Sequence, residues 1–155
     1  MSWDEKESLA HIRFIPEPVN NYDFEVDVVV TPRYRKIDMA RNFTGWNCLI
    51  TTLHKMGLSV GVCGQKHTSF NIEDAKYCAW DYTDVDADVA LIKASKIVIG
   101  QESGLAYLTM LCEKPLMIID HCHRHIADKH RNHDVFFKTI DPSHIRNELE
   151  AFMAI

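Results

Sequence analysis

The sequence predicts an α/β protein built on a doubly wound, mostly parallel sheet with helices on both faces. Two observations lead to this prediction. Short β-branched and apolar runs alternate with segments whose apolar residues recur at helical spacing, as in successive strand–helix–strand units. The runs are also too uniformly apolar for a sheet with one face in water, which is typical of central parallel strands. With 155 residues, one domain accounts for the regular pattern.

The amino-terminal segment lacks this pattern. Residues 1–25 contain Pro16 and Pro18 and show little periodicity, so we expect an arm or linker in which only His11–Ile15 could form a short edge strand. Residues 26–155 are expected to form the domain itself. No internal repeat interrupts this domain.

The strands are identified by their apolar runs and the helices by apolar residues three and four positions apart. Strands are predicted at Val26–Val30, Leu58–Cys63, Tyr77–Trp80, Lys96–Ile99, Leu116–Ile119 and Val135–Phe137. The inward faces of the helices are predicted to carry, in chain order, Trp46, Leu49, Ile50 and Leu53; Val85, Val89 and Ile92; Leu105, Leu108 and Cys112; and Ile145, Leu149 and Phe152.

Capping residues support these helix boundaries. Gly57 stands where the first helix would end. The residues Thr83–Asp86 form a capping-box sequence for the second helix, and Ser103 is expected to cap the third. Asp141 and Pro142 have the chemistry of an N-cap and a first helical residue for the last helix. Together these elements predict a Rossmann-like single domain.

Composition and charge exclude several classes of protein. The chain has 17 basic and 22 acidic residues, so its net charge of −5 gives no argument for nucleic acid or an anionic membrane as partner. No run approaches the roughly 20 apolar residues of a membrane span, and Met1–Glu7 is acidic where a signal peptide would be basic. The five cysteines form no CxxC pair, which indicates reduced thiols and a cytoplasmic protein.

In a doubly wound sheet the ligand lies at the carboxyl ends of the strands, where the strand order reverses. This rule selects four loops: Thr31–Thr44, Gly64–Asn71, Trp80–Asp84 and Gly100–Gly104.

The loop Gly100–Gly104 is the strongest candidate for an anion site. It leads from a buried strand to a helix N-terminus, where free backbone N–H groups and the helix dipole favour a pyrophosphate. The carboxylate of Glu102 could accept two hydrogen bonds from a ribose or sugar diol. The alternative is that Glu102 and Ser103 only cap the helix.

The same segment resembles a known family. The residues Gly100–Leu108 (Gly-Gln-Glu-Ser-Gly-Leu-Ala-Tyr-Leu) followed by Glu113–Ile118 (Glu-Lys-Pro-Leu-Met-Ile) are similar to the donor-binding half of GT-B glycosyltransferases, closest to the ADP-heptose:lipopolysaccharide heptosyltransferase type. The resemblance covers about residues 26–120. It implies that Glu102, Ser103 and Gly104 contact a nucleotide diphosphate-sugar. Glu102 stands where the family usually has Asp, and Tyr107 stands where it has His.

Four cations in the loop after the first strand, Arg33, Arg35, Lys36 and Arg41, could face this anion site. The resemblance implies a basic residue at the donor phosphates, and Arg33 and Arg41 are the candidates; a solvated surface loop is the alternative. Gly64 and Lys66 end the second strand and Thr83 precedes a helix, so these three are further donor-binding candidates. A simple turn and a helix cap explain them equally well.

Five histidines between His121 and His133 suggest a metal site, but they lack a recognised ligand spacing and a solvated, pH-sensitive loop fits them better. We therefore predict no metal and no cofactor. Ser103 lacks the Gly-x-Ser-x-Gly context of a nucleophile, and Cys63 and Cys112 are expected in the core. The catalytic residues remain unknown.

These features predict a nucleotide-diphosphate-sugar-binding domain of a heptosyltransferase-like GT-B glycosyltransferase. Because such enzymes react in a cleft between two domains, an acceptor-binding domain or subunit is an expected partner, and a homo-oligomer is possible. Two alternatives remain: a stand-alone nucleotide-binding regulatory module, and a small nucleoside-processing hydrolase or transferase with Glu102 as nucleophile. The donor base, the sugar and the acceptor are not predicted.

Overall fold

The computed structural model describes residues 15–37, 39–82, 85–101, 103–119, 137–140 and 142–154. For Arg41, Pro142 and residues 137–140 only the backbone is described.

The sheet has six strands in the order β3-β2-β1-β4-β5-β6, and every neighbouring pair is parallel. The predicted fold class is therefore confirmed, with a sheet that is parallel throughout. From β1 the chain moves outward in one direction to β3, and from β4 it moves outward in the other. The order therefore reverses between β1 and β4. The strands are β1 (Val28–Thr31), β2 (Val60–Val62), β3 (Tyr77–Cys78), β4 (Ile97–Gly100), β5 (Leu116–Ile119) and β6 (Phe137–Ile140).

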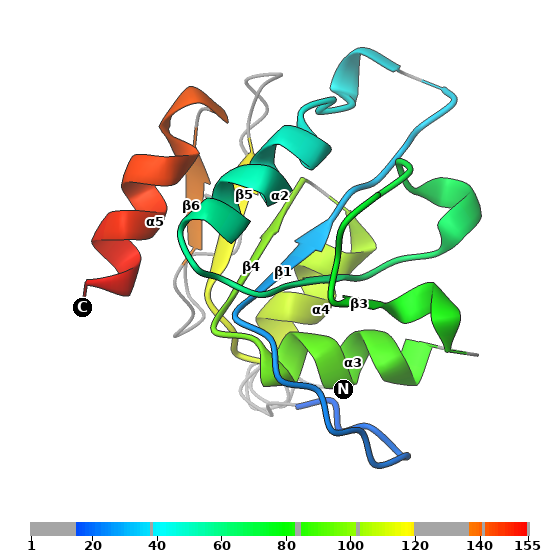
Figure 1. Cartoon of the computed structure of the whole chain (residues 1–155). Helices are drawn as coiled ribbons and strands as arrows, with labels where there is room; N and C mark the ends of the chain where they lie inside the picture. The colour runs from blue at the N-terminus through cyan, green and yellow to red at the C-terminus, as the bar shows by residue number, and fades with distance from the viewer. Residues whose placement is uncertain are drawn as a thin grey trace, which may run out of the picture.

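Helices cover both faces of this sheet (Figure 1). The helices are α2 (Trp46–Lys55), α3 (Val85–Ala94), α4 (Gly104–Leu111) and α5 (Ile145–Met153). Side chains alternate across β1, so Val28 and Val30 pack with α2 and α5 whereas Val29 packs with α3 and α4. Short 3₁₀ turns lie at η1 (Met39–Arg41), η2 (Lys66–Thr68), η3 (Ala79–Asp81) and η5 (Pro142–His144).

Most of the predicted core is buried, and Gly57 follows α2 with a φ of +81°. Val85 is different: it was predicted to face inward, but it is 63% exposed. It is the first residue of α3 and lines a cavity. In α4 the buried residues are Ala106, Thr109 and Met110. The predicted Leu105 and Leu108 also pack against this core, and they are only half-buried because they line the same cavity.

The predictions near the carboxyl terminus were displaced. The sixth strand is Phe137–Ile140 and shares only Phe137 with the predicted range. Pro142 opens a 3₁₀ turn, and α5 begins at Ile145 with His144 as N-cap. A 3₁₀ turn is a common start to a helix and postpones the cap by one turn. Asp141 and the histidines 121–133 lie outside the described residues.

The described part of the arm packs along α3. The Nζ of Lys93 donates to the carbonyl of Pro16 at 3.0 Å, and the carboxylate of Asp86 accepts from the backbone N of Asn20 at 2.9 Å. Ile15 is exposed and belongs to no strand, so the predicted edge strand is not formed there; residues 11–14 lie outside the described range. None of the helices described has the length and apolarity to cross a membrane.

Candidate functional site

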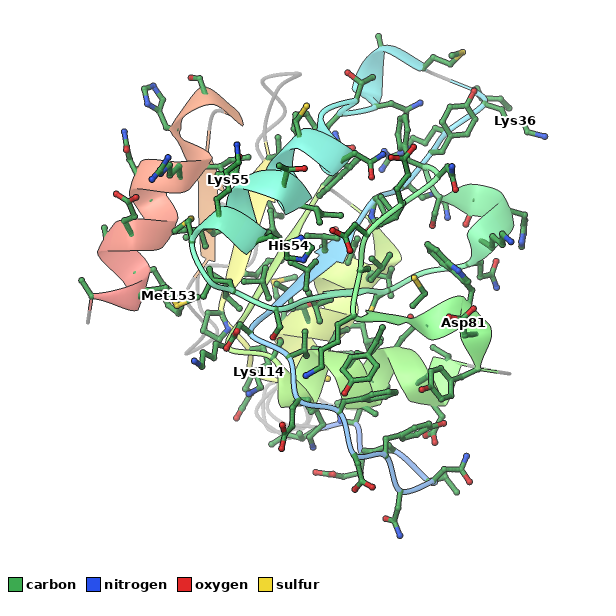
Figure 2. All side chains as sticks on the ribbon, viewed as in Figure 1. Lys36, His54, Lys55, Asp81, Lys114 and Met153 are labelled. Carbon is green, nitrogen blue, oxygen red and sulfur yellow. The ribbon has the colours of Figure 1, made fainter. Side chains whose placement is uncertain are left out.

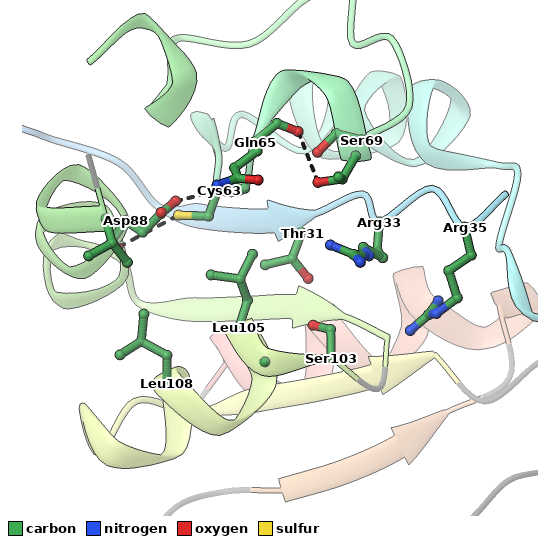
Figure 3. Close-up of a pocket in the computed structure, with 14 residues that line it drawn as sticks. Thr31, Arg33, Arg35, Cys63, Gln65, Ser69, Asp88, Ser103, Leu105 and Leu108 are labelled. Atoms are coloured by element: carbon green, nitrogen blue, oxygen red, sulfur yellow. Dashed lines mark hydrogen bonds between the residues drawn. The ribbon is translucent and has the colours of Figure 1, made fainter. Parts of the chain in front are cut away.

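A cavity of about 410 Å³ opens at the carboxyl edge of the sheet, on the face covered by α3 and α4 (Figure 3). It is lined by the ends of β1 and β2, the loops that follow them, and the first turns of α3 and α4. This position is beside the point where the strand order reverses, which is where open α/β sheets bind their ligands.

The loops after β1 and β2 pair with each other above this edge. Arg33 and Ser69 form an isolated antiparallel bridge, the N of Tyr34 donates to the carbonyl of Thr68 at 2.8 Å, and the N of Phe70 donates to the carbonyl of Pro32 at 2.9 Å. This pairing fixes the backbone that carries Arg33 at the cavity.

Two of the four predicted cations, Arg33 and Arg35, line the cavity. Arg33 is exposed, and no ion pair to it occurs within the described part of the chain. Lys36 lies at the tip of the loop and points away from the sheet (Figure 2). The side chain of Arg41 is not described. The loop thus supplies guanidinium charge on its inner side.

A buried amide holds Arg35 in this loop. The Oδ1 of Asn42 accepts from the backbone N of Arg35 and its Nδ2 donates to the backbone O of Arg35, both at 2.9 Å. The Oε1 of Gln101, after β4, accepts from the N of Phe43 at 3.0 Å. Asn42 therefore holds two parts of the loop after β1 together, and Gln101 ties this loop to the end of β4, on the other side of the point where the strand order reverses.

Two hydroxyl groups at the cavity are shielded from solvent and lack hydrogen-bond partners among the described residues. They are Thr31 Oγ1, at the end of β1, and Ser103 Oγ, before α4. Figure 3 shows them pointing toward each other. Thr31 is 2% exposed, and a Cβ at its sheet partner Gly100 would lie only 2.2 Å from Thr31 Oγ1. The glycine therefore makes room for this hydroxyl.

The N-terminus of α4 lies at the same place. Ser103 occupies the N-cap position, but its side chain makes no capping hydrogen bond; its carbonyl accepts from Ala106 and Tyr107. Helix geometry leaves the N–H groups of Gly104 and Leu105 without carbonyl partners in the helix. Ser103 is therefore the N-cap in position, as predicted, without satisfying the helix with its hydroxyl.

The other end of the cavity contains a buried carboxylate. Asp88, on α3, is 7% exposed, and its Oδ1 accepts from the N of Gly64 at 2.9 Å. The thiol of Cys63 contacts the carbonyl of Asp88 at 3.7 Å. Burial, and then the charge of Asp88, raise the pKa of Cys63 well above the ordinary value, so this thiol stays protonated.

The predicted site residues are only partly brought together. Arg33, Gly64, Ser103 and Gly104 line the cavity, whereas Lys66 does not. Glu102 and Thr83 lie outside the described residues.

Sequence reasoning missed Thr31, Asn42 and Asp88. A polar residue ending an apolar strand was a usable signal for Thr31. The positions of Asn42 and Asp88 follow only from tertiary packing.

Across the described ranges, no group of three or more His, Cys, Asp or Glu side chains could hold a metal ion.

No protein-family model matches the sequence, and neither does any curated protein. Two solved structures are similar in fold. One is the bacterial iron-containing dodecameric glycosyltransferase TibC from enterotoxigenic E. coli H10407, with 19% identity over 70% of this chain and a TM-score of 0.48. The other is the dodecameric iron-containing heptosyltransferase TibC in complex with ADP-D-beta-D-heptose, with 21% identity over 64% of this chain and a TM-score of 0.47. This chain spans 31% and 28% of their respective lengths.

Proposed function

We propose that this chain is a nucleotide-diphosphate-sugar-binding domain of a heptosyltransferase-like GT-B glycosyltransferase, and that the cavity beside β1 and α4 binds the diphosphate. One observation carries this proposal: the buried hydroxyls of Thr31 and Ser103 have no partner in the described protein and meet where a helix N-terminus and Arg33 converge.

The chemistry of these groups selects the ligand. Each hydroxyl and each free N–H of the first turn of α4 can donate a hydrogen bond, and Arg33 adds a charged donor. A ligand that satisfies them must offer several acceptors and negative charge at one place. A diphosphate has this character, and a helix N-terminus favours it further.

The remaining parts of the proposal follow the sequence resemblance. Glu102 is proposed to accept hydrogen bonds from a diol of the donor, and Arg41, Lys66 and Thr83 to contact the donor from the surrounding loops. An acceptor-binding domain or partner would complete the catalytic cleft. During transfer, Arg33 and the helix-end N–H groups would stabilise the departing nucleoside diphosphate.

Isothermal titration of the chain with ADP, UDP and their sugar conjugates tests the proposal. We expect binding of at least one nucleoside diphosphate, and Arg33→Gln should weaken it about tenfold to a hundredfold, the usual effect of losing a hydrogen bond to a charged group. Lys36→Gln is the matched control, because it removes the same charge from the same loop outside the cavity. Equal losses in the two variants, or no binding of any nucleoside diphosphate, would refute the site.

The same titrations separate the alternative functions. Release of free base from a nucleotide would identify a nucleoside-processing enzyme. Tight binding that persists without transfer when a complete acceptor-binding partner is supplied would identify a regulatory module.

A further inference from the structure

The loop after β1 projects beyond the sheet and exposes apolar side chains. Figure 1 shows the chain running past the end of β1 and returning through η1 to α2. In this loop Ile37 is 88% exposed and Met39 is 59% exposed. Lys36 is exposed beside them and points away from the sheet (Figure 2). Lys36, Ile37 and Met39 form the loop tip.

Contacts at the base of the loop hold the backbone that carries the loop tip. The buried side chain of Asn42 accepts from the backbone N of Arg35 and donates to its backbone O, both at 2.9 Å. Arg33 forms the isolated bridge to Ser69. The loop is therefore closed on both sides of its tip, so a partner can bind the exposed side chains without first ordering the backbone.

The charge of this loop is opposite to that of the whole chain. Residues 33–41 contain four basic residues and one acidic residue, whereas the net charge of the chain is −5. Arg33 and Lys36 are exposed, and neither has an ion pair within the described ranges. An anionic surface would attract this loop and repel the rest of the chain, so the loop would approach such a surface first.

The size and shape of the loop tip favour a lipid surface over a protein. A stable protein interface buries about 800 Å² on each partner, and two apolar side chains on a projecting loop supply only a small part of this area. A bilayer requires less, because a few apolar side chains can enter the headgroup region while neighbouring cations contact the lipid charges. Ile37 and Met39 supply the apolar groups, and Lys36 supplies a cation.

We propose that the loop tip docks this protein on an anionic lipid surface, with Ile37 and Met39 inserted among the headgroups and Lys36 beside their negative charges. Arg33 and Arg35 line the cavity, whereas the residues of the loop tip do not. Docking therefore uses the outer side of the loop and leaves its inner side for a ligand. The inference goes beyond the proposed function and does not depend on it.

Cosedimentation with lipid vesicles tests the proposal. The wild type should bind vesicles of equimolar phosphatidylcholine and phosphatidylserine more tightly than vesicles of phosphatidylcholine alone, and added salt should weaken this binding. Ile37→Ser should weaken it about tenfold, the effect of withdrawing most of one apolar side chain from the interface. Lys36→Gln should weaken it about fivefold, which corresponds to about 1 kcal/mol for one cation at the surface. Both residues are exposed, so both variants should keep the wild-type Tm.

Each variant has a matched control. Val19→Ser removes another β-branched apolar side chain, which is 91% exposed on the arm, and Figure 1 shows the arm at the far end of the molecule from this loop. Lys55→Gln removes the charge of an exposed lysine on α2. Both controls should bind the vesicles as the wild type does. Lys36→Gln should also keep the wild-type affinity for ADP, which separates lipid docking from binding in the cavity.

Three results of the vesicle experiment would overturn the proposal: no binding to the phosphatidylserine vesicles, equal binding to both kinds of vesicle, or equal losses in the loop variants and their controls. Sedimentation velocity adds a further test. A dimer that Ile37→Ser dissociates, in a protein that binds no vesicles, would assign the loop tip to a second copy of this chain instead. Failure to bind any nucleoside diphosphate would refute the proposed function and leave the vesicle result standing.

Discussion

Replacing Thr31 with valine should change stability and ligand binding in opposite directions. The Oγ1 of Thr31 is buried without a partner among the described residues. Folding therefore removes water from this hydroxyl without giving it a hydrogen bond in return. Valine has a similar shape, and its branched side chain also suits a strand end. We therefore expect Thr31→Val to stabilise the fold and to weaken the binding of a nucleoside diphosphate.

The magnitude follows from the environment of the hydroxyl. Leaving a buried polar group unpaired costs about 1–3 kcal/mol. The new methyl group is slightly larger than the hydroxyl and contacts Gly100, the position where a Cβ would lie 2.2 Å from Thr31 Oγ1. This crowding offsets part of the gain, which leaves about 1–2 kcal/mol of added stability. At roughly 2–4 °C per kcal/mol for a domain of this size, the Tm should rise by about 2–8 °C.

Affinity should fall at the same time. A hydroxyl that donates to a charged phosphate oxygen contributes about 1.5–3 kcal/mol, which corresponds to roughly tenfold to a hundredfold in Kd. Urea unfolding of the free protein and isothermal titration with ADP measure the two quantities separately.

Thr109→Val is the control for this experiment. Thr109 is also buried, but its Oγ1 donates to the carbonyl of Leu105 at 2.7 Å, and it does not line the cavity. It should not gain stability and should bind ADP as the wild type does. A loss of stability in Thr31→Val with unchanged affinity would show that this hydroxyl has a structural role, and the reasoning would be wrong.

Three further predictions concern the surroundings of the site and the acid side of the stability curve. Gly64→Ala should lose about 1–3 kcal/mol in urea unfolding, because Gly64 has a φ of +124° and a Cβ there would lie 3.0 Å from Ser69 Oγ; an unchanged midpoint would contradict this. A hydrogen bond from the backbone of Ser59 is the main cause of the lowered pKa of Asp27, whose ordinary value is 3.8. The stability that Asp27 contributes is complete above that value and is lost as the pH falls through the lower folded pKa, so Asp27→Asn should flatten the acid side of the urea-midpoint profile. In the native protein at mildly alkaline pH, a thiol reagent should label the exposed Cys48 and spare Cys63, whose pKa is raised by burial; equal labelling rates in peptide mapping would show that Cys63 is accessible.

The layers and the strand alternation could be predicted because they depend on local apolar patterning. Val28–Val30 and Ile97–Ile99 are buried on both faces of the sheet, and their uniform apolarity is visible in the sequence. Val85 was assigned to the core because periodicity cannot distinguish a buried helix face from one at the rim of a cavity, whereas Leu105 and Leu108 do pack against the core and also line the cavity. The displaced start of α5 has a similar origin, since capping chemistry permits a 3₁₀ turn before the helix.

The candidate site was predictable only where one loop carries its own signal. Ser103 and Gly104 follow a buried strand directly, and Arg33 follows another, so the rule for parallel sheets selected them. Asn42 acts on a backbone seven residues away, and Asp88 accepts from Gly64 across 24 positions. Nothing in a local pattern marks an amide or a carboxylate for such a contact, because the partner is chosen by the packing of α3 and the loops on the finished sheet.

The unpaired hydroxyls and the glycines of this edge have a common physical meaning. Gly64 adopts a backbone conformation that other residues adopt at a cost, Gly100 leaves space over Thr31, and the Oγ atoms of Thr31 and Ser103 stay buried without partners. Each feature lowers the stability of the free domain, and all of them lie around one cavity at the switch point. Packing alone would favour larger or apolar residues at these positions. A ligand that brings acceptor atoms to both hydroxyls would restore the missing hydrogen bonds, so binding should raise the stability of the wild type more than that of Thr31→Val.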